Sequence, residues 1–439
     1  MSFIGIDLGA TFLKGAWLHP GSGLSDVHRE PFPNFLAGLP PRRREVCMQS
    51  VLTAVHRLIK RLLDGQSCAC AGILICGQMH GFVLVQPDGT PVGNFISWQD
   101  ARCSETDANG VSHFEIARKK LGASLIAELG NEFRSGLPVA TLHALARGGE
   151  LAKGLMPLSL MDFIAASLTG AASFTHSTNA AAHGLFNVAR GEWHIEALTA
   201  LGLEDLRLPQ PQSEIVPVGR ARLCGRDFPV YIPVGDQQAA LFGVDLVPGE
   251  LSVNVATGSQ VSVLVDKPEA GDWQLRPYFD GRWLRTITHL PAGRALNRML
   301  HLVSELATDQ GTELRDPWGQ ISRMAEAAEL RSLKADLSFF PTAYGCEGAF
   351  THILEDDMTV GSFFRAAFRA MSENYAISAE RVSPAGWSCV VFSGGLVQRL
   401  PVLRAEILDR LGASSRSAVQ VEDTLEGLLA LSCRVVASK

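Results

Sequence analysis

The sequence has none of the long apolar runs that a membrane span needs, and it has no excess of basic residues. No apolar stretch reaches the roughly 18 residues required to cross a bilayer. Its 39 lysines and arginines are outnumbered by 45 acidic residues, which gives a formal net charge of −6. A nucleic-acid or anionic-membrane partner calls for a basic face, so neither is expected. The start, MSFIGIDLG, has no basic leader and predicts no signal peptide, so we expect a cytoplasmic protein.

Cysteine is present, but not in a disulfide or metal-binding pattern. The nine cysteines are an odd number scattered among apolar residues, which is typical of reduced thiols. Cys68 and Cys70 form a Cys-x-Cys pair, yet no second Cys or His pair stands at a zinc spacing from them. Packing of buried thiols is therefore the favoured interpretation.

The chain also lacks low-complexity stretches and long linkers. Its 439 residues exceed what one compact core usually holds, which favours two domains. The segment GVDLVPGE at 243–250 supplies turn residues between strong elements. We predict domains over residues 1–245 and 246–439.

Two stretches half a chain apart share one pattern: GIDLGATFLKGAW at 5–17 and ELSVNVATGSQVSVLV at 250–265. Each has a β-rich apolar run, a tight turn of small and hydroxyl residues, and a second β-rich run. Glycine and threonine at a hairpin tip leave backbone N–H groups free to face an anion. The pattern predicts a duplicated fold that holds a nucleotide polyphosphate between its halves.

The rest of the chain alternates helices and strands. Apolar residues at helical spacing predict a helix over 51–63, and a buried strand over 71–76 follows. FPVYIPVG at 228–235 predicts a strand that leads into a helix over 236–243. In the second half we expect a long helix, a strand and another helix, over 361–382, 388–395 and 400–412.

Two acidic residues stand where predicted strands end. Asp7 opens the first glycine turn, where a carboxylate would face phosphates and hold Mg²⁺, usually through water. Capping of the turn is the alternative, although the second hairpin favours the functional interpretation. Asp236 follows the strand at 228–235, either as the N-cap of a helix, which it fits better when taken alone, or as a general base for an attacking hydroxyl.

Two loops carry side chains suited to a sugar. Gln78, Met79 and His80 offer donors, acceptors and apolar contact, although such a tripeptide in a loop is unremarkable by itself. Trp98 can pack on a sugar face while Asp100 accepts hydroxyl hydrogen bonds. A core tryptophan beside an Asp–Arg pair on the surface is the alternative. The segment VFSGGL at 391–396 leads from a strand to a Gly-Gly turn that a ring or phosphate could approach closely.

Together, these motifs resemble the FGGY carbohydrate kinases. Asp7-x-Gly9-x-Thr11-x-x-Lys14, GQMHG, WQDAR, GDQQA, the Thr257-Gly258 hairpin and FSGGL occur in the order seen in that family, over nearly the whole chain. The resemblance implies an α/β, actin-like (ribonuclease H-like) ATPase fold with two domains, duplicated halves and a cleft between them. It also implies phosphorylation of a carbohydrate, with ATP and Mg²⁺ as cofactors.

The resemblance assigns a role to each matched position. Asp236 would be the general base for the primary hydroxyl of a ketose, and Asp7 would support Mg²⁺ together with Asp236. The residues around the phosphates would be Gly9, Thr11, Lys14, Thr257 and Gly258. Those against the adenosine would be Gly394 and Gly395. The sugar contacts would be Gln78, Met79, His80, Trp98 and Asp100, with Gln237 beside the base.

Within the family, the branch acting on sedoheptulose, a seven-carbon ketose, is the most similar. SWQDARCS, the segment at 175–203 and VATL at 139–142 resemble that branch. Phosphorylation of the terminal hydroxyl of sedoheptulose is therefore the expected activity. The xylulose kinases come next, so xylulose or another pentulose is the alternative substrate.

Two departures from the family pattern suggest a different class of function. Ala10 stands where the family usually has Thr, and GCEG at 345–348 lacks the Arg of the family's Gly-Glu-Arg element. A catalytically weak, actin-like sugar sensor would fit these changes. The sequence does not reveal the oligomeric state, for which a homodimer is the expectation.

Overall fold

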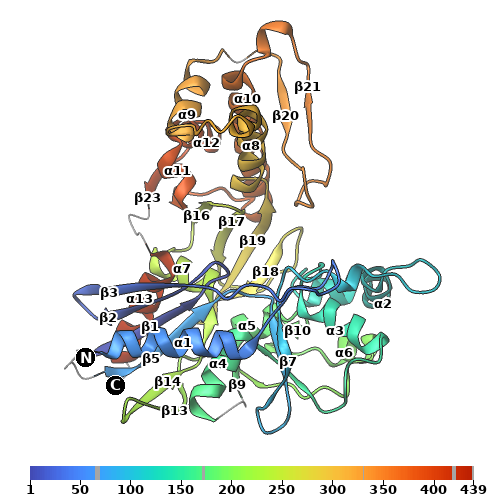
Figure 1. Ribbon diagram of the computed structural model, residues 1–439, viewed down its shortest axis with the longest axis vertical. Helices are drawn as coiled ribbons and strands as arrows, with labels where there is room; N and C mark the ends of the chain where they lie inside the picture. Colours follow the sequence, from blue (N-terminus) through green and yellow to red (C-terminus); the bar gives the residue numbers. More distant parts are fainter. Residues whose placement is uncertain (65–69, 171–173, 330, 418–421, 438–439) are drawn as a thin grey trace.

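The computed structural model describes residues 1–439 except 65–69, 171–173, 330, 418–421 and 438–439. Two lobes lie one above the other in Figure 1, and each is built on a mixed β-sheet. The helices are α1 (Met48–Leu63), α2 (His113–Glu128), α3 (Pro138–Arg147), α4 (Leu160–Thr169), α5 (Ser177–Ala182), α6 (Ile195–Leu201), α7 (Asp236–Gly243), α8 (Gly293–Asp309), α9 (Pro317–Ala327), α10 (Val360–Val382), α11 (Gly395–Arg399), α12 (Pro401–Leu411) and α13 (Asp423–Ala437).

The sheet of the lower lobe has the order β13-β14-β5-β1-β2-β3, and β15 also pairs with β5. Its strands are β1 (Ser2–Leu8), β2 (Phe12–His19), β3 (Gly23–Pro31), β5 (Cys70–Gly77), β13 (Pro217–Leu223), β14 (Arg226–Tyr231) and β15 (Val234–Gly235). Strands β1 and β2 form an antiparallel hairpin, and β1 runs parallel to β5. The turn of this hairpin is the first of the two predicted tips.

The sheet of the upper lobe repeats this arrangement, in the order β18-β19-β17-β16-β22-β23. Its strands are β16 (Glu250–Val255), β17 (Ser259–Val265), β18 (Gln274–Pro277), β19 (Trp283–Leu290), β22 (Cys389–Ser393) and β23 (Ser414–Ser417). Here β16 and β17 form the antiparallel hairpin, and β16 runs parallel to β22. The matching topology of the two sheets confirms the predicted duplicated α/β fold.

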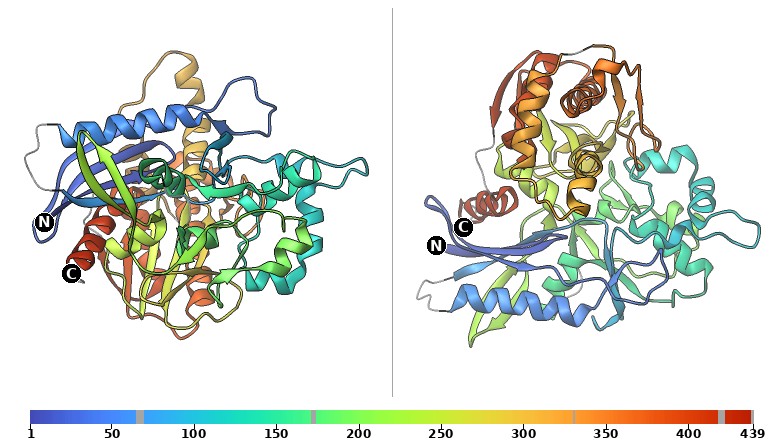
Figure 2. Two further views of the ribbon diagram at one scale, coloured as in Figure 1. Left: turned by 90° about the horizontal axis from the view of Figure 1, so that it is seen from below. Right: turned by 45° about the horizontal axis from the view of Figure 1, so that its top comes forward.

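The faces of the lower sheet are set by alternation along β1, because successive side chains of a strand point to opposite sides. Ile4, Ile6 and Leu8 are fully buried in a cluster with α1 and α4. Phe3 belongs to a cluster on the opposite face, with α7 and α13. Figure 2 shows α1 and α13 on these two sides of the sheet. Asp7 is in phase with Phe3, so it points toward α7 and α13.

The upper sheet is covered on one face by helices. The long helix α10 packs on β17 and β19 and also contacts α8, α9 and α12. Tyr375 of α10 is fully buried there and donates a hydrogen bond to Ser259 Oγ of β17, at 2.8 Å. The long helix predicted at 361–382 is therefore present and anchors the upper lobe.

Helices α7 and α13 lie between the two sheets. One apolar cluster joins Phe3 and Leu74 of the lower sheet to Leu264 and Val391 of the upper sheet through these helices. Although α13 comes from the end of the chain, it contacts β1, β2, β3 and β5. The predicted domain boundary at 245/246 stays a prediction. Helix α13 lies in the second predicted domain by its sequence, but it contacts the sheet of the lower lobe.

Smaller elements extend both lobes. A four-stranded sheet with the order β4-β7-β6-β8 lies beside α2, α3 and α6 in the lower lobe, and the β20–β21 hairpin lies at the edge of the upper lobe (Figure 1). Two further strand pairs are β9–β12 and β10–β11. The bounds are β4 (Glu45–Val46), β6 (Phe82–Val85), β7 (Pro91–Ile96), β8 (Met156–Ser159), β9 (Phe174–His176), β10 (Phe186–Asn187), β11 (Glu192–Trp193), β12 (Gln210–Gln212), β20 (Lys334–Asp336) and β21 (Ala349–Thr351).

The contact between α7 and α13 depends on glycine. A Cβ at Gly427 would lie 1.9 Å from the carbonyl oxygen of Ala239, and a Cβ at Gly243 would lie 2.6 Å from the amide nitrogen of Gly427. Both distances are far below van der Waals contact, so the two helix backbones lie too close for a side chain at either position.

Gly427→Ala should therefore destabilise the protein. We expect the free energy of unfolding to fall by about 1–3 kcal/mol, the usual cost of overpacking a well-packed contact, measured by urea denaturation followed by circular dichroism. Gly395→Ala is the control, because a Cβ there meets no atom within 4 Å. Equal stability of the two variants would contradict the proposed role of the close approach.

Candidate active site

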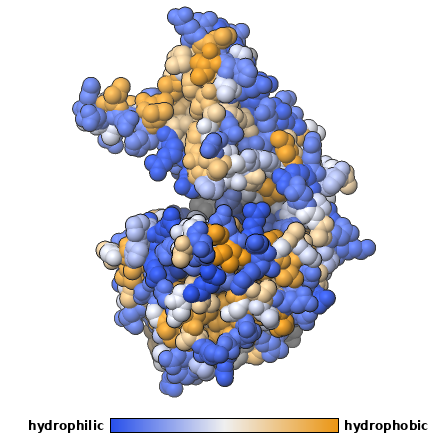
Figure 3. Space-filling view, turned by 90° about the vertical axis from the view of Figure 1, so that its right-hand side faces the viewer, coloured by the Kyte–Doolittle hydropathy of each residue, from blue (hydrophilic) through white to orange (hydrophobic). Residues whose placement is uncertain are grey.

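The first hairpin tip presents a carboxylate and a tight turn. Asp7 stands at the end of β1, opposite Lys14 on β2, and is only 3% exposed. Gly9 makes the turn possible, since a Cβ there would lie 2.8 Å from the carbonyl oxygen of Phe12. Thr11 is exposed at the tip. The surface is hollowed between the lobes, as Figure 3 shows from one side.

The Asp7 carboxylate is only partly satisfied. Its Oδ2 accepts a hydrogen bond of 2.7 Å from Thr424 Oγ1 and lies 3.7 Å from Lys14 Nζ. Its Oδ1 is buried and has no hydrogen-bond partner among the described residues. Burial raises the pKa of Asp7 above its usual value, against the lowering effect of Lys14. A buried carboxylate oxygen without a partner is suited to a hard cation.

The ammonium of Lys14 is held by two carboxylates. Lys14 Nζ lies 2.9 Å from Glu422 Oε2, and Glu422 is also paired with Arg29 of β3. Glu422 immediately precedes α13, and Thr424 belongs to its first turn. The start of α13 therefore fixes both Asp7 and Lys14. Sequence reasoning missed Glu422 and Thr424 because no motif marks their approach to the first hairpin.

Asp236 is the first residue of α7. The N-cap of this helix is Gly235, so the alternative that Asp236 itself is the N-cap is wrong. Its Oδ1 accepts a hydrogen bond of 2.8 Å from the Gln237 amide. Burial first, and then the negative charge of Asp7, raise the pKa of Asp236 to about 7, against the lowering effects of the Gln237 amide and Arg276. A carboxyl group with this pKa can accept a proton near neutral pH.

A buried polar cluster adjoins Asp236. Arg276 of β18 donates to the side-chain oxygen of Gln237 and to Glu132 Oε1, the latter at 2.5 Å. Burial alone would raise the pKa of Glu132, but Arg276 and Arg134 hold it at about 2. Glu132 and Arg276 were not singled out from the sequence, since they are far apart in the chain and match no motif.

His80 joins the same region through Arg134. His80 Nδ1 lies 3.1 Å from the carbonyl oxygen of Ala182 and its Nε2 lies 2.8 Å from Arg134 Nη2. Since Arg134 can only donate, Nε2 accepts and Nδ1 carries the proton. Burial and the charge of Arg134 place the pKa of His80 well below its usual value. Arg134 also donates to Thr288 Oγ1 of the upper sheet, at 3.1 Å, so it connects the two lobes.

Met79 lies next to the predicted base. The Sδ atom of Met79 is 2.9 Å from the position a Cβ would take on Gly235, directly before Asp236. The backbone N–H of Gln78 donates to the carbonyl oxygen of Leu8, at 3.0 Å. The GQMHG loop is thus brought together with the first hairpin and with the start of α7.

The second sugar loop divides into an exposed and a buried part. The ring of Trp98 is 40% exposed, so it is not the core tryptophan of the alternative interpretation. Asp100 is 1% exposed, and its two oxygens accept hydrogen bonds from Arg102 and from the Arg44 amide. The Asp–Arg pair of the alternative interpretation is therefore present, but its place on the surface is wrong, because Asp100 and Arg102 are both buried. A sugar contact by Asp100 stays a prediction.

The upper lobe brings the second hairpin and the Gly-Gly turn together. Thr257 and Gly258 are exposed at the tip between β16 and β17. Gly394 has a φ of +88°, and a Cβ there would lie 2.4 Å from the carbonyl oxygen of Val255. Gly395 is exposed beside it. These four predicted nucleotide contacts thus share one edge of the upper sheet.

Two other sequence features are the GCEG segment and the pair of Cys68 and Cys70. The GCEG segment at 345–348 is exposed in the connection between β20 and β21. Cys68 lies outside the described residues, so its pairing with Cys70 is not described. The described cysteines are free thiols.

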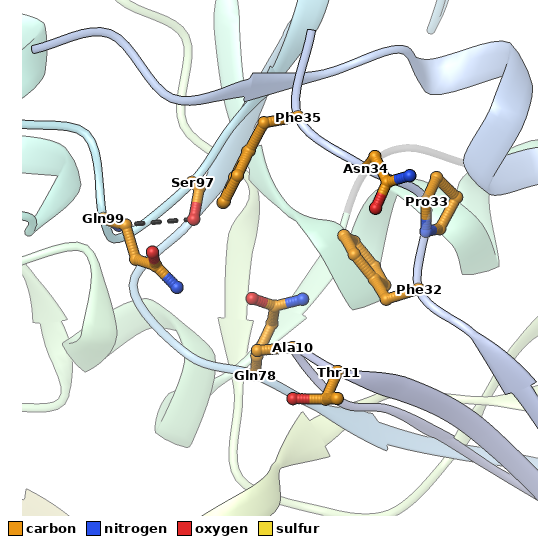
Figure 4. A pocket seen from close by; sticks show the side chains of 9 residues that line it. All are labelled: Ala10, Thr11, Phe32, Pro33, Asn34, Phe35, Gln78, Ser97 and Gln99. Atoms are coloured by element: carbon orange, nitrogen blue, oxygen red, sulfur yellow. Dashed lines mark hydrogen bonds between the residues drawn. The ribbon is translucent and has the colours of Figure 1, made fainter. Parts of the chain in front are cut away.

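A pocket of about 210 Å³ opens beside the first hairpin tip (Figure 4). It lies between the hairpin, the segment that follows β3, and the two predicted sugar loops. Its walls are formed by Ala10, Thr11, residues 32–35, Gln78, Ser97 and Gln99.

Comparisons with known proteins agree with this arrangement. A profile of the FGGY family of carbohydrate kinases, N-terminal domain, matches residues 2–243, more than half of the chain. The sedoheptulokinase of Mus musculus is 24% identical over 456 aligned residues, covering 92% of this chain and 91% of that protein. The crystal structure of gluconate kinase from Lactobacillus acidophilus has a TM-score of 0.86 at 16% identity, covering 100% of this chain and 90% of that one. Ligand-bound xylulose kinase from the same organism has a TM-score of 0.83 at 17% identity, with coverages of 99% and 90%.

The duplicated sheets and the likeness to these kinases define an actin-like ATPase fold and a phosphotransferase. The chain belongs to the FGGY family of carbohydrate kinases. Members of this family use ATP as a substrate. Among the described residues, no helix combines the length and apolar character needed to cross a membrane.

Arg276→Met should destabilise the fold, because Glu132 would keep a buried charge without its nearest partner. We expect a loss of about 3 kcal/mol in the free energy of unfolding, the lower end for a broken buried ion pair. The lower end applies because Arg134 Nη1 remains 4.0 Å from Glu132 Oε2. Guanidinium chloride denaturation measures the loss. Arg331→Met, which removes exposed ion pairs with Glu329 and Asp356, is the control and should leave stability almost unchanged. Equal effects of both variants would contradict the expectation.

Proposed function

We propose that this kinase transfers the γ-phosphoryl group of ATP to the terminal primary hydroxyl of sedoheptulose, with Asp236 as the general base. The observation that carries the proposal is the placement of Asp236 at the start of α7, with a pKa raised to about 7. The similarity to the sedoheptulokinase of Mus musculus along 92% of the chain supports the choice of sugar. Xylulose is the second candidate, supported by the fold shared with xylulose kinase.

In the proposed reaction, the Asp236 carboxylate accepts the proton of the sugar hydroxyl while the hydroxyl oxygen bonds to the γ-phosphorus. The bond between that phosphorus and the β,γ-bridging oxygen breaks, and ADP leaves. A pKa of about 7 makes Asp236 a stronger base than an ordinary aspartate, yet leaves it substantially ionised at neutral pH. The Gln237 amide orients the carboxylate through Oδ1.

Asp7 and Asp236 are the residues we propose to hold Mg²⁺. The buried, unpartnered Oδ1 of Asp7 fits a cation, and Mg²⁺ in kinases is usually held by one or two carboxylates together with phosphates and water. No group of three or more His, Cys, Asp or Glu in the described part of the chain forms a complete cage, which is compatible with such a partial site. When bound, Mg²⁺ would offset the charge of the β- and γ-phosphates.

The other predicted residues keep their proposed roles. We assign the phosphates to the two hairpin tips, formed by Gly9, Thr11, Thr257 and Gly258, and to Lys14 on β2. We assign the adenosine to Gly394 and Gly395. We assign the sugar to Gln78, Met79, His80, Trp98, Asp100 and Gln237, and add Arg134 because it bonds His80.

Asp236→Asn tests the base directly. Because the amide cannot take the proton, we expect turnover to fall by at least about 100-fold, the low end of general-base contributions. ADP release is measured with MgATP and a panel of sedoheptulose, xylulose, ribulose, fructose, glycerol and gluconate. Asp227→Asn, at an exposed position, is the control and should keep wild-type turnover.

Three outcomes of this panel distinguish the functions. Preference for sedoheptulose supports the proposal, and preference for xylulose keeps the mechanism while correcting the substrate. Binding of nucleotide and sugar without turnover on any member would replace the kinase by a sugar sensor. Full turnover by Asp236→Asn would remove Asp236 from the mechanism.

The pH dependence should report the same group. The base must be ionised, so kcat/KM should fall about tenfold per pH unit below the pKa of Asp236, which is raised to about 7 without Mg²⁺ and is lowered by a bound cation, and level off above it. Steady-state kinetics between pH 5 and 9 give the profile. The residual activity of Asp236→Asn should lack this acidic limb; an acidic limb shared by both proteins would assign the titration to another group.

A further inference from the structure

Two buried polar side chains of the lower lobe lead to the backbone just before Asp236. Thr178 of α5 and His176 at the end of β9 are both 0% exposed. The Gly235 N–H donates a hydrogen bond of 3.1 Å to Thr178 Oγ1. Because Gly235 is the N-cap of α7 and Asp236 is its first residue, this hydrogen bond lies one residue from the proposed base.

The hydrogen-bond partners of His176 determine the direction of each bond. His176 Nε2 lies 3.1 Å from the carbonyl oxygen of Ser213, which can only accept, so Nε2 carries the proton. Burial lowers the pKa of His176 to about 4, so its ring is neutral at neutral pH and Nδ1 is an acceptor. The Thr178 N–H also donates to Nδ1, at 3.3 Å. The Thr178 hydroxyl, 2.9 Å from Nδ1, therefore donates to it and accepts from the Gly235 N–H.

Helix α5 holds the segment before Asp236 at two points. Gly235 has no side chain with which to cap α7, and no side-chain cap is formed there. Thr178 instead accepts from its N–H, and the next residue of α5, Asn179, donates from Nδ2 to the carbonyl oxygen of Pro233 at 3.0 Å. Strand β5 pairs with the same segment, opposite Gly77. The backbone that carries Asp236 is thus fixed by polar contacts from a separate helix.

We propose that Thr178 is a positioning residue for the general base. Its hydroxyl, oriented by His176, fixes the Gly235 peptide and so the direction in which the Asp236 carboxyl meets the sugar hydroxyl. The inference rests on the proposed role of Asp236. A displacement of order 1 Å at a reacting group can cost about 100-fold in rate. Without the Thr178 hydroxyl, a buried N–H loses its acceptor, which favours a shift of this segment.

Thr178→Val tests the role, because it removes the hydroxyl with little change in size. ADP release is measured with MgATP and the preferred sugar of the panel. We expect kcat to fall about 10- to 100-fold, with KM values for sugar and ATP within about twofold of wild type, since the base acts in the transition state. Thr178→Ser keeps the hydroxyl and should restore most of kcat.

Thr175→Val is the matched control. Thr175 is 1% exposed, and its hydroxyl donates to Asp162 Oδ2 rather than accepting from Gly235. The same substitution there should keep the wild-type kcat. Wild-type kcat in Thr178→Val, or an equal loss of kcat in Thr175→Val or Thr178→Ser, would overturn the positioning role and leave the kinase function intact.

Two variants of His176 test the orientation of the hydroxyl, and they also serve if Thr178→Val does not fold. His176→Asn places an amide oxygen near the position of Nδ1 and keeps an acceptor for Thr178. His176→Gln keeps a donor near the position of Nε2 and loses that acceptor. We expect kcat to be lower in His176→Gln than in His176→Asn. Equal values, or the reverse order, would overturn the proposed orientation.

Failure of the proposed function has a different signature. If wild-type protein turns over no sugar of the panel, the kinase function fails, and hydrogen exchange of the Gly235 amide decides whether Thr178 holds the start of α7. Faster exchange in Thr178→Val than in both wild type and Thr175→Val supports the contact. Equal exchange in the three proteins overturns it.

Discussion

The site depends on the close packing of α7 against α13 between the two sheets. Backbone meets backbone at Gly427 and Ala239, where a single added Cβ would collide. Because α7 begins at Asp236, and Thr424 and Glu422 stand at the start of α13, this contact also fixes the polar groups at the start of both helices. The lower sheet then supplies Asp7 on the face that points toward the same two helices.

That packing creates an electrostatic conflict that suits phosphoryl transfer. Asp7 is buried and Asp236 is half-buried on the same side of the lower sheet, and the negative charge of Asp7 disfavours the ionised form of Asp236. Lys14 and Arg276 offset the conflict only in part. The result is one carboxyl group with a pKa near neutrality and another with an unpartnered oxygen, the combination that a proton acceptor and a cation ligand require.

Local pattern carried much of the fold prediction. The predicted helix at 51–63 lies within α1, and the long helix predicted at 361–382 is α10. Both follow from apolar residues at helical spacing, which is a property of neighbouring residues. The cluster of Glu132, Arg134 and Arg276 could not be found in this way. Its members come from a loop and a strand about 140 residues apart, and they meet only because the loop packs against β18.

The sequence by itself determined the two hairpins, the positions of Asp7 and Asp236 at the ends of strands, and the order of the motifs, because each of these depends on a short run of residues. Tertiary structure decided which of those residues are free to act. It engaged the two oxygens of Asp100 with Arg102 and with the Arg44 amide, and it made Gly235 rather than Asp236 the N-cap of α7. It left Asp7 Oδ1 and Gln78 Nε2 without partners among the described residues. Burial and the presence of a partner are set by the surrounding segments, and most of these come from distant parts of the chain.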